Sequence, residues 1–110
     1  MCETYNGWTN RETWATKLHL DNDEYLNECA YEYAREEIAG GKATPYNLGE
    51  TLKNWVEDEL LTFEKITQAN SDGHWLWLML TDIGSLYRVN WQEIAQSYLE
   101  EIAIELQNAL

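Results

Sequence analysis

Residues 74–80, with the sequence HWLWLML, form the most apolar stretch of this 110-residue chain, and they decide its fold class. Together with Ile83 and Leu86, they place apolar side chains on nearly every side of a helix that runs from His74 to about Tyr87. A helix that is apolar all round is usually buried among other helices. We therefore predict a helical bundle in which this segment is the central helix.

Four further segments have apolar residues at the helical period, and no segment alternates between apolar and polar residues as a strand does. The predicted helices run from Thr9 or Asn10 to Asp21, from Glu24 to Ala39, from about Leu48 to Gln68, and from Asn90 towards the C-terminus. A loop is expected through Thr44-Pro45, because the residue before a proline avoids helical geometry. The sequence thus predicts one all-α domain over residues 1–110, a compact bundle of about five helices.

Two helix starts have the spacing of a capping box, in which the first and fourth residues cap each other's backbone. Thr9 with Glu12 has this spacing at the first helix, and Asn10 is an alternative cap. Asn90 with Glu93 has it at the last helix. Both starts are therefore expected to be closed locally.

The charge balance excludes several classes of function. Seven Lys and Arg residues stand against twenty Asp and Glu residues, which gives a formal net charge of −13. Direct binding to nucleic acid or to an anionic membrane surface needs clustered basic residues, so we expect neither. No run approaches the ~20 apolar residues of a membrane-spanning helix, and the N-terminus lacks the features of a signal peptide, so an intracellular protein is expected.

The most regular charge pattern is a row of four glutamates, Glu24, Glu28, Glu32 and Glu36, which we call the glutamate row. The spacing of four places them along one face of a helix, about 18 Å long with neighbours ~6 Å apart. Glu37 adds a further carboxylate beside the row. Arg35 is the basic residue close enough to reduce the charge repulsion in its last turns. Such a row can imitate a nucleic-acid backbone and occupy a basic groove of another protein, or it can be a solvated helix face that keeps an acidic protein soluble.

Catalytic chemistry has little support in the sequence. His19 and His74 are the two histidines, and neither has the spacing of a metal site. Asp82, inside the most apolar helix, is either a buried carboxyl with a raised pKa or a residue on the one solvated side. We predict no catalytic residue, no metal and no cofactor. The alternative, a small metal-dependent hydrolase, requires a pocket that gathers His19 or His74 with carboxylates.

Two segments resemble a known group of proteins. Residues 6–14, NGWTNRETW, resemble the N-terminal signature of an uncharacterised family of small phage and archaeal-virus proteins, Asn-Gly-aromatic-Thr-Asn-x-x-Thr-Trp. Residues 89–95, VNWQEIA, with the acidic tail after them, resemble the end of those proteins. The resemblance covers about a quarter of the chain. It implies a viral or mobile-element origin, and hence the cytoplasm of a bacterial host cell, but no activity and no catalytic residues.

The expected function is therefore a non-enzymatic interaction, with a protein partner that has a basic groove. The protein is expected to inhibit a nucleic-acid-handling protein or to act as a decoy for its nucleic acid. The partner-binding residues are expected to be the glutamate row with Glu37, Trp8 and Arg11. The alternative is a structural or regulatory accessory protein that forms a homodimer through an aromatic patch around Tyr5, Trp8 and Tyr46.

Overall fold

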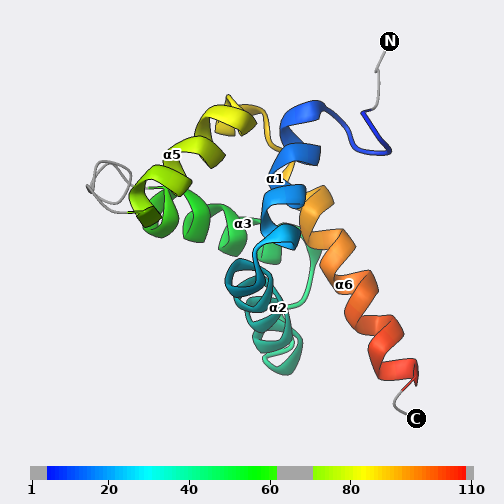
Figure 1. The fold of residues 1–110 in the computed structure, drawn as a ribbon. Helices are drawn as coiled ribbons and strands as arrows, with labels where there is room; N and C mark the ends of the chain where they lie inside the picture. The colour runs from blue at the N-terminus through cyan, green and yellow to red at the C-terminus, as the bar shows by residue number, and fades with distance from the viewer. Residues whose placement is uncertain (1–4, 62–70, 109–110) are drawn as a thin grey trace.

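The computed structural model describes residues 5–61 and 71–108, with the backbone alone for residues 71–75 and 77. Its helices are α1 (Arg11–Asn22), α2 (Glu24–Ala39), α3 (Pro45–Asn54), α5 (Ser71–Ile83) and α6 (Trp91–Asn108), with a π-helix, η1 (Trp55–Leu60), and a 3-10 helix, η2 (Leu86–Arg88) (Figure 1). The described residues form no β-sheet, and a bridge between Tyr5 and Trp8 precedes α1. The predicted all-α bundle is confirmed.

The tightest packing in the described residues is between α3 and α6, which make the most extensive contact of any two elements. Gly49 of α3 is buried against the first turn of α6. A Cβ atom there would lie 3.1 Å from the carbonyl carbon and oxygen of Trp91 and from the backbone nitrogen of Gln92. Glycine therefore allows the two helix backbones to approach closely.

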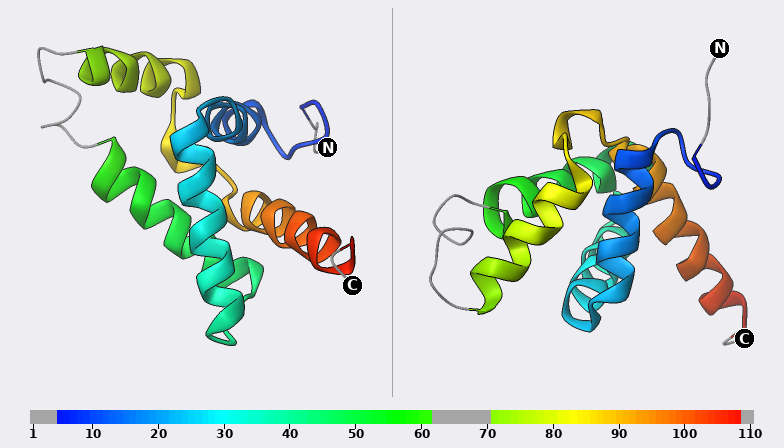
Figure 2. Two further views of the ribbon diagram at one scale, coloured as in Figure 1. Left: turned by 60° about the horizontal axis from the view of Figure 1, so that its bottom comes forward. Right: turned by 45° about the horizontal axis from the view of Figure 1, so that its top comes forward.

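The apolar helix is not central, which corrects the prediction from residues 74–80. α5 lies at an edge of the bundle and packs against α1 (Figures 1 and 2). Leu76, Met79 and Ile83 are buried, whereas Leu78 is 46% exposed. Apolar composition shows that a helix can be buried on every side, but the number of neighbours depends on the path of the whole chain.

Three predicted boundaries also differ. Thr44 caps α3 with its side chain, and Pro45 is the first helical residue, where its missing N–H costs nothing. The predicted loop therefore ends before Pro45. The π-helix η1 continues α3 to Leu60, and the rest of the third predicted helix lies outside the described residues. The α5 helix ends at Ile83 rather than at Tyr87, because Gly84 adopts a φ of +87°.

The α2 helix has the predicted limits, and local caps explain both of them. Asp23 accepts a hydrogen bond from the backbone N–H of Leu26, and Gly40 closes the last turn. Leu26, Ala30 and Ala34 are buried on one face of the helix. The opposite face, which carries the glutamate row, is therefore directed towards solvent.

Candidate functional site

The helices α1 and α6 begin side by side, and each helix helps to cap the other. Asn10 caps α1 and accepts the backbone N–H of Thr13, while Asn90 caps α6 and accepts the backbone N–H of Glu93. Across the pair, Thr13 Oγ1 accepts the N–H of Asn90 at 2.9 Å. Glu93 Oε1 accepts the N–H of Thr9, also at 2.9 Å. Each helix thus provides a side chain, Thr13 from α1 and Glu93 from α6, that accepts a backbone N–H at the start of the other helix. We call this arrangement the exchanged caps.

This exchange corrects the capping box predicted for the first helix. Asn10, not Thr9, is the cap, and Glu12 is directed to Arg88, with 3.6 Å between Oε2 and Nη1. Asn10 also donates from Nδ2 to the carbonyl of Arg88 at 2.8 Å. The two segments that carried the family resemblance are therefore in contact with each other and join the starts of α1 and α6.

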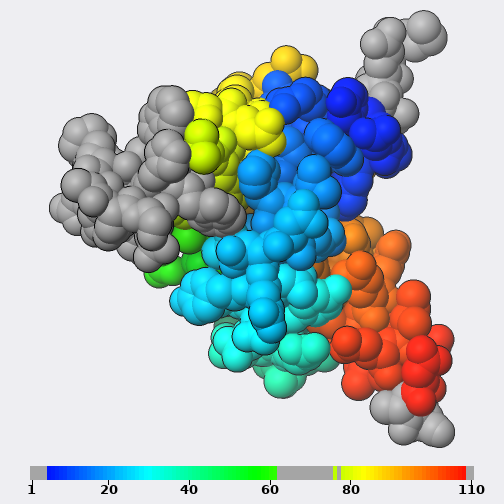
Figure 3. All heavy atoms as spheres, in the orientation of Figure 1, coloured from blue at the N-terminus to red at the C-terminus, as the bar shows by residue number. Residues whose placement is uncertain are grey.

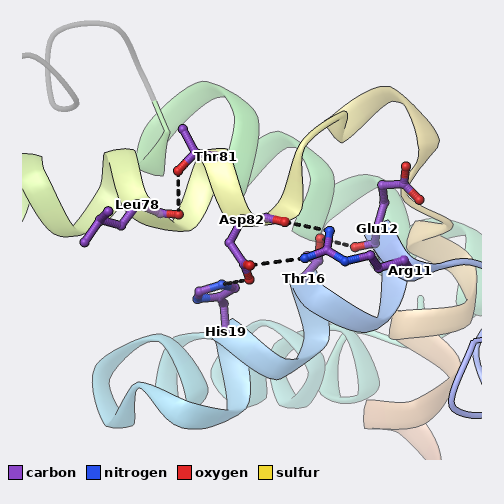
Figure 4. A network of polar contacts seen from close by, with 7 residues as sticks. All are labelled: Arg11, Glu12, Thr16, His19, Leu78, Thr81 and Asp82. Carbon is purple, nitrogen blue, oxygen red and sulfur yellow. Dashed lines mark hydrogen bonds and ion pairs between the residues drawn. The ribbon is translucent and has the colours of Figure 1, made fainter.

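A second polar network connects α1 to α5 (Figure 4). Arg11 donates to the backbone carbonyl of Asp82 at 2.7 Å and to its Oδ1 at 3.1 Å, and His19 Nε2 lies 2.8 Å from Oδ2. The hydrogen bond with His19 and, to a smaller extent, the charge of Arg11 lower the pKa of Asp82. The Asp82 side chain is 49% exposed, so it lies on the solvated side of the apolar helix. Arg11, predicted to bind a partner, has an intramolecular role here.

The four glutamates of the glutamate row are all exposed, and Glu37 is half-buried. Within residues 5–61 and 71–108, no basic side chain forms an ion pair with any of them. Arg35 does not relieve the row as expected, because it pairs with Glu105 of α6 at 3.5 Å and lies over the ring of Tyr31. The negative charge of the row is therefore left without an internal counter-charge.

The structure adds α6 to this acidic surface. Tyr31 of α2 donates a hydrogen bond to Glu101, which places that carboxylate, like Glu105, beside α2. Figure 3 shows α2 and the C-terminal half of α6 next to each other on one face of the molecule. Glu100 is also exposed. The sequence contained these acids, but helix periodicity could not predict that α6 returns to lie beside α2.

The predicted aromatic residues do not behave as one group. Tyr5 is 40% exposed and packs against Trp14, with 5.0 Å between ring centroids. Trp8 is half-buried against the core. Tyr46, 60% exposed, lies in the first turn of α3 and lines a hollow at the end of α2 to which neither Tyr5 nor Trp8 contributes. Trp8 therefore contributes packing, and Tyr46 belongs to a different part of the surface.

Among the hollows lined by described residues, two combine acidic and basic side chains. One, of about 720 Å³, lies beside the exchanged caps and includes Lys53, Arg88, Glu50 and Glu57. The other, of about 500 Å³, lies where α2 ends and α3 begins. In the described residues no group of three His, Cys, Asp or Glu side chains is placed to hold a metal ion. His74, part of the alternative metal site, has no described side chain.

The parts of the chain that the structure describes contain no helix with both the length and the apolarity to cross a bilayer. No curated protein and no solved structure matches this chain. The model of one family, described as a family of unknown function (DUF7249), matches residues 1–108. This match covers nearly the whole chain, including the caps of α1 and α6, and the protein therefore belongs to this family.

Proposed function

We propose that this protein is a non-enzymatic interaction protein whose acidic surface binds a basic groove of a nucleic-acid-handling protein. The observation that carries the proposal is the exposure of all four row glutamates without a basic partner among the described residues. Carboxylates spaced ~6 Å apart along a rigid helix form a linear array of negative charge, as phosphates do. A basic groove on another protein is complementary to such an array.

The cost of the row supports the same interpretation. Each pair of like charges four residues apart destabilises a helix by about 0.2–0.5 kcal/mol, and the row contains three such pairs in succession. The fold does not compensate for them, because the nearby Arg35 is directed to α6. This repulsion is relieved when an external cation or a basic surface neutralises the array.

The biological role that fits this surface is inhibition or decoy action, with the acidic face in the place of nucleic acid. We also propose a phage or archaeal-virus origin and action in the cytoplasm of a bacterial host. The resemblance of residues 6–14 and 89–95 to small viral proteins supports that origin. Small acidic viral proteins that block host defence provide an analogy for the role.

Affinity capture from a bacterial lysate tests the proposal. The tagged protein is incubated at low salt and at ~0.5 M salt, where exposed charge pairs are largely screened. We expect a nucleic-acid-binding protein that is retained at low salt and released at high salt. Recovery of salt-resistant partners without a basic groove would contradict the proposal.

Recovery of the protein alone would favour the accessory-protein alternative. Light scattering separates the two interpretations, because a homodimer held by apolar contacts persists in ~1 M salt. We expect a monomer at low salt, where two copies of a chain with a net charge of −13 repel each other. At ~1 M salt the repulsion is screened, and we still expect a monomer, because Trp8 packs against the core of its own chain.

A further inference from the structure

The segment in front of α1 contains a tight turn with Asn6 and Gly7 at its centre. Tyr5 and Trp8 exchange two backbone hydrogen bonds across this turn, with N···O distances of 2.7 and 2.8 Å. Asn6 has a φ of +50°, and Gly7 has a φ of +88°. Positive φ at both central residues of a two-residue loop is typical of a type I′ turn. The turn lies at the periphery of the bundle (Figure 1).

The two central residues are also a chemically reactive pair. Asparagine is a labile residue, because the backbone nitrogen that follows it can attack its side-chain amide. Glycine obstructs this attack least, since it has no Cβ. Asn6-Gly7 is the one Asn-Gly pair in the sequence, and every other asparagine precedes a residue with a side chain. Both residues are exposed, so water and hydroxide can reach them.

The closed turn prevents this attack. Ring closure requires the Gly7 nitrogen and the Asn6 side chain to lie on the same side of the Asn6 Cα–C bond. At the first central residue of a type I′ turn ψ is about +30°, which places the following nitrogen nearly opposite to Cβ. The Gly7 nitrogen is then directed away from Asn6 Cγ. The reaction therefore requires that the turn opens and ψ of Asn6 rotates.

The contacts that close the turn can break while the bundle stays folded. Besides the two backbone hydrogen bonds, the Tyr5 ring packs against Trp14, with 5.0 Å between the ring centroids. Tyr5 is 40% exposed and is not part of the buried core. Local opening at the edge of a fold needs less free energy than global unfolding. The frequency of this opening therefore limits how often Asn6 can react.

We propose that Asn6 is a site of spontaneous deamidation and that opening of the Tyr5–Trp8 turn sets its rate. In the open turn, solvent base removes the amide proton of Gly7, and the nitrogen forms a bond to Asn6 Cγ. The bond from Cγ to the side-chain nitrogen breaks, and this nitrogen takes up a proton from water and leaves as ammonia. The product is a five-membered succinimide. This modification site is independent of the acidic surface and goes beyond the proposed function.

Water then opens the succinimide in one of two ways. Cleavage of the bond from Cγ to nitrogen gives aspartate, and cleavage of the main-chain bond gives iso-aspartate, in which the chain runs through the side chain. Either product adds one negative charge to the formal net charge of −13. Aspartate preserves the turn, since Asp-Gly is also typical of type I′. Iso-aspartate lengthens the main chain by one methylene group, so the two hydrogen bonds between Tyr5 and Trp8 cannot both form.

Peptide mass mapping of the full chain in a mildly alkaline buffer tests the proposal. Deamidation is followed at every asparagine, both in the native protein and in concentrated urea. We expect Asn6 to react first in urea and at least about tenfold more slowly in the native protein, because the open turn is a minor state. Faster reaction of another asparagine in urea would overturn the site. Equal rates at Asn6 in both conditions would overturn the control by the turn.

Two tyrosine variants test the turn itself. Tyr5→Ala removes the contact with Trp14 and leaves Asn6-Gly7 intact, and Tyr46→Ala is the matched control at an exposed tyrosine of α3. We expect Tyr5→Ala to deamidate at Asn6 several-fold faster than the unmodified protein in the native state and at the same rate in urea. Tyr46→Ala should match the unmodified protein in both conditions. No acceleration in Tyr5→Ala, or an acceleration that persists in urea, would overturn the proposal.

Discussion

Thr13 Oγ1 accepts the backbone N–H of Asn90 at 2.9 Å, although 77 residues separate them in the chain. Asn90 is the cap of α6, so a side chain of α1 satisfies the first backbone group of another helix. The return bond, from the N–H of Thr9 to Glu93, makes the arrangement reciprocal. The start of each helix therefore depends on the other helix being in place.

The first prediction concerns this exchanged cap. Thr13→Val keeps the shape of the side chain but leaves the Asn90 N–H without an acceptor. Because Thr13 is fully buried, we expect a loss of about 1–3 kcal/mol in the free energy of unfolding, measured by urea denaturation. Thr51→Val is the control, since the Thr51 hydroxyl bonds only to the Asn47 carbonyl of its own helix among the contacts described. Equal losses in both variants would show that the exchange adds nothing to stability.

The close crossing of α3 and α6 gives a second prediction. Gly49→Ala adds a methyl group 3.1 Å from the backbone of Trp91 and Gln92, and backbone atoms cannot move aside as a side chain tip can. Alanine gains up to about 1 kcal/mol in helix propensity, but forced overpacking costs about 1–3 kcal/mol, so we expect net destabilisation.

Gly40→Ala is the matched control for that variant. Gly40 has a φ of −83°, and an added Cβ would meet nothing closer than 3.4 Å. We expect its thermal midpoint to stay near that of the unmodified protein. A Gly49→Ala protein as stable as this control would show that the two helices can separate without cost.

Local signals explain which parts of the fold the sequence could predict. The limits of α2 depend on Asp23 and on Gly40-Gly41, which lie next to the helix that they bound. The exposure of the glutamate row follows from the burial of Leu26, Ala30 and Ala34 on the opposite face. Asn90 was predicted as a cap for the same local reason.

Long-range geometry explains what the sequence could not predict. The partners of Thr13 and Glu93 lie 77 and 84 residues away, and no spacing rule connects them. The edge position of α5 depends on how many other helices the path of the chain places around it, and no local pattern contains that information. Arg35 was expected to relieve the row, but its actual partner, Glu105, belongs to α6. The hollow where α2 ends and α3 begins could not be predicted, because its walls come from two helices joined by a turn.

The pH dependence of the Asp82 network is a third prediction. His19 and Arg11 lower the folded-state pKa of Asp82, so the network stabilises the fold above the unfolded-state pKa of about 3.9. This stability is lost as the pH falls through the lowered pKa. Because the Asp82 side chain is 49% exposed, we expect Asp82→Asn to cost at most about 1 kcal/mol at pH 7. The cost should shrink towards zero near pH 2 in urea titrations, and a cost independent of pH would contradict the ion-pair interpretation.

The glutamate row gives a fourth prediction, in which stability and binding change in opposite directions. Glu28→Gln/Glu32→Gln removes all three like-charge pairs of the row, each worth about 0.2–0.5 kcal/mol. We expect the double variant to unfold at a higher temperature at low salt, with helicity unchanged or higher by circular dichroism. The gain should diminish in ~0.5 M salt, which screens the repulsion.

Glu57→Gln/Asp58→Asn is the control for that change. It removes two negative charges from η1, where neither residue has an acidic neighbour four positions away and Glu57 follows Lys53 by four. We expect no stabilisation in this variant. A similar gain in both double variants would attribute the effect to total charge rather than to the row.

The most direct test of the central claim is capture of the partner by three proteins from one bacterial lysate. These are the unmodified protein, Glu28→Gln/Glu32→Gln and Glu57→Gln/Asp58→Asn, each at low salt and at ~0.5 M salt. We predict that the unmodified protein and the η1 variant retain the same basic, nucleic-acid-binding protein at low salt, whereas the row variant retains several-fold less. Equal capture by all three proteins, or capture that persists at high salt, would contradict the claim that the glutamate row is the binding surface.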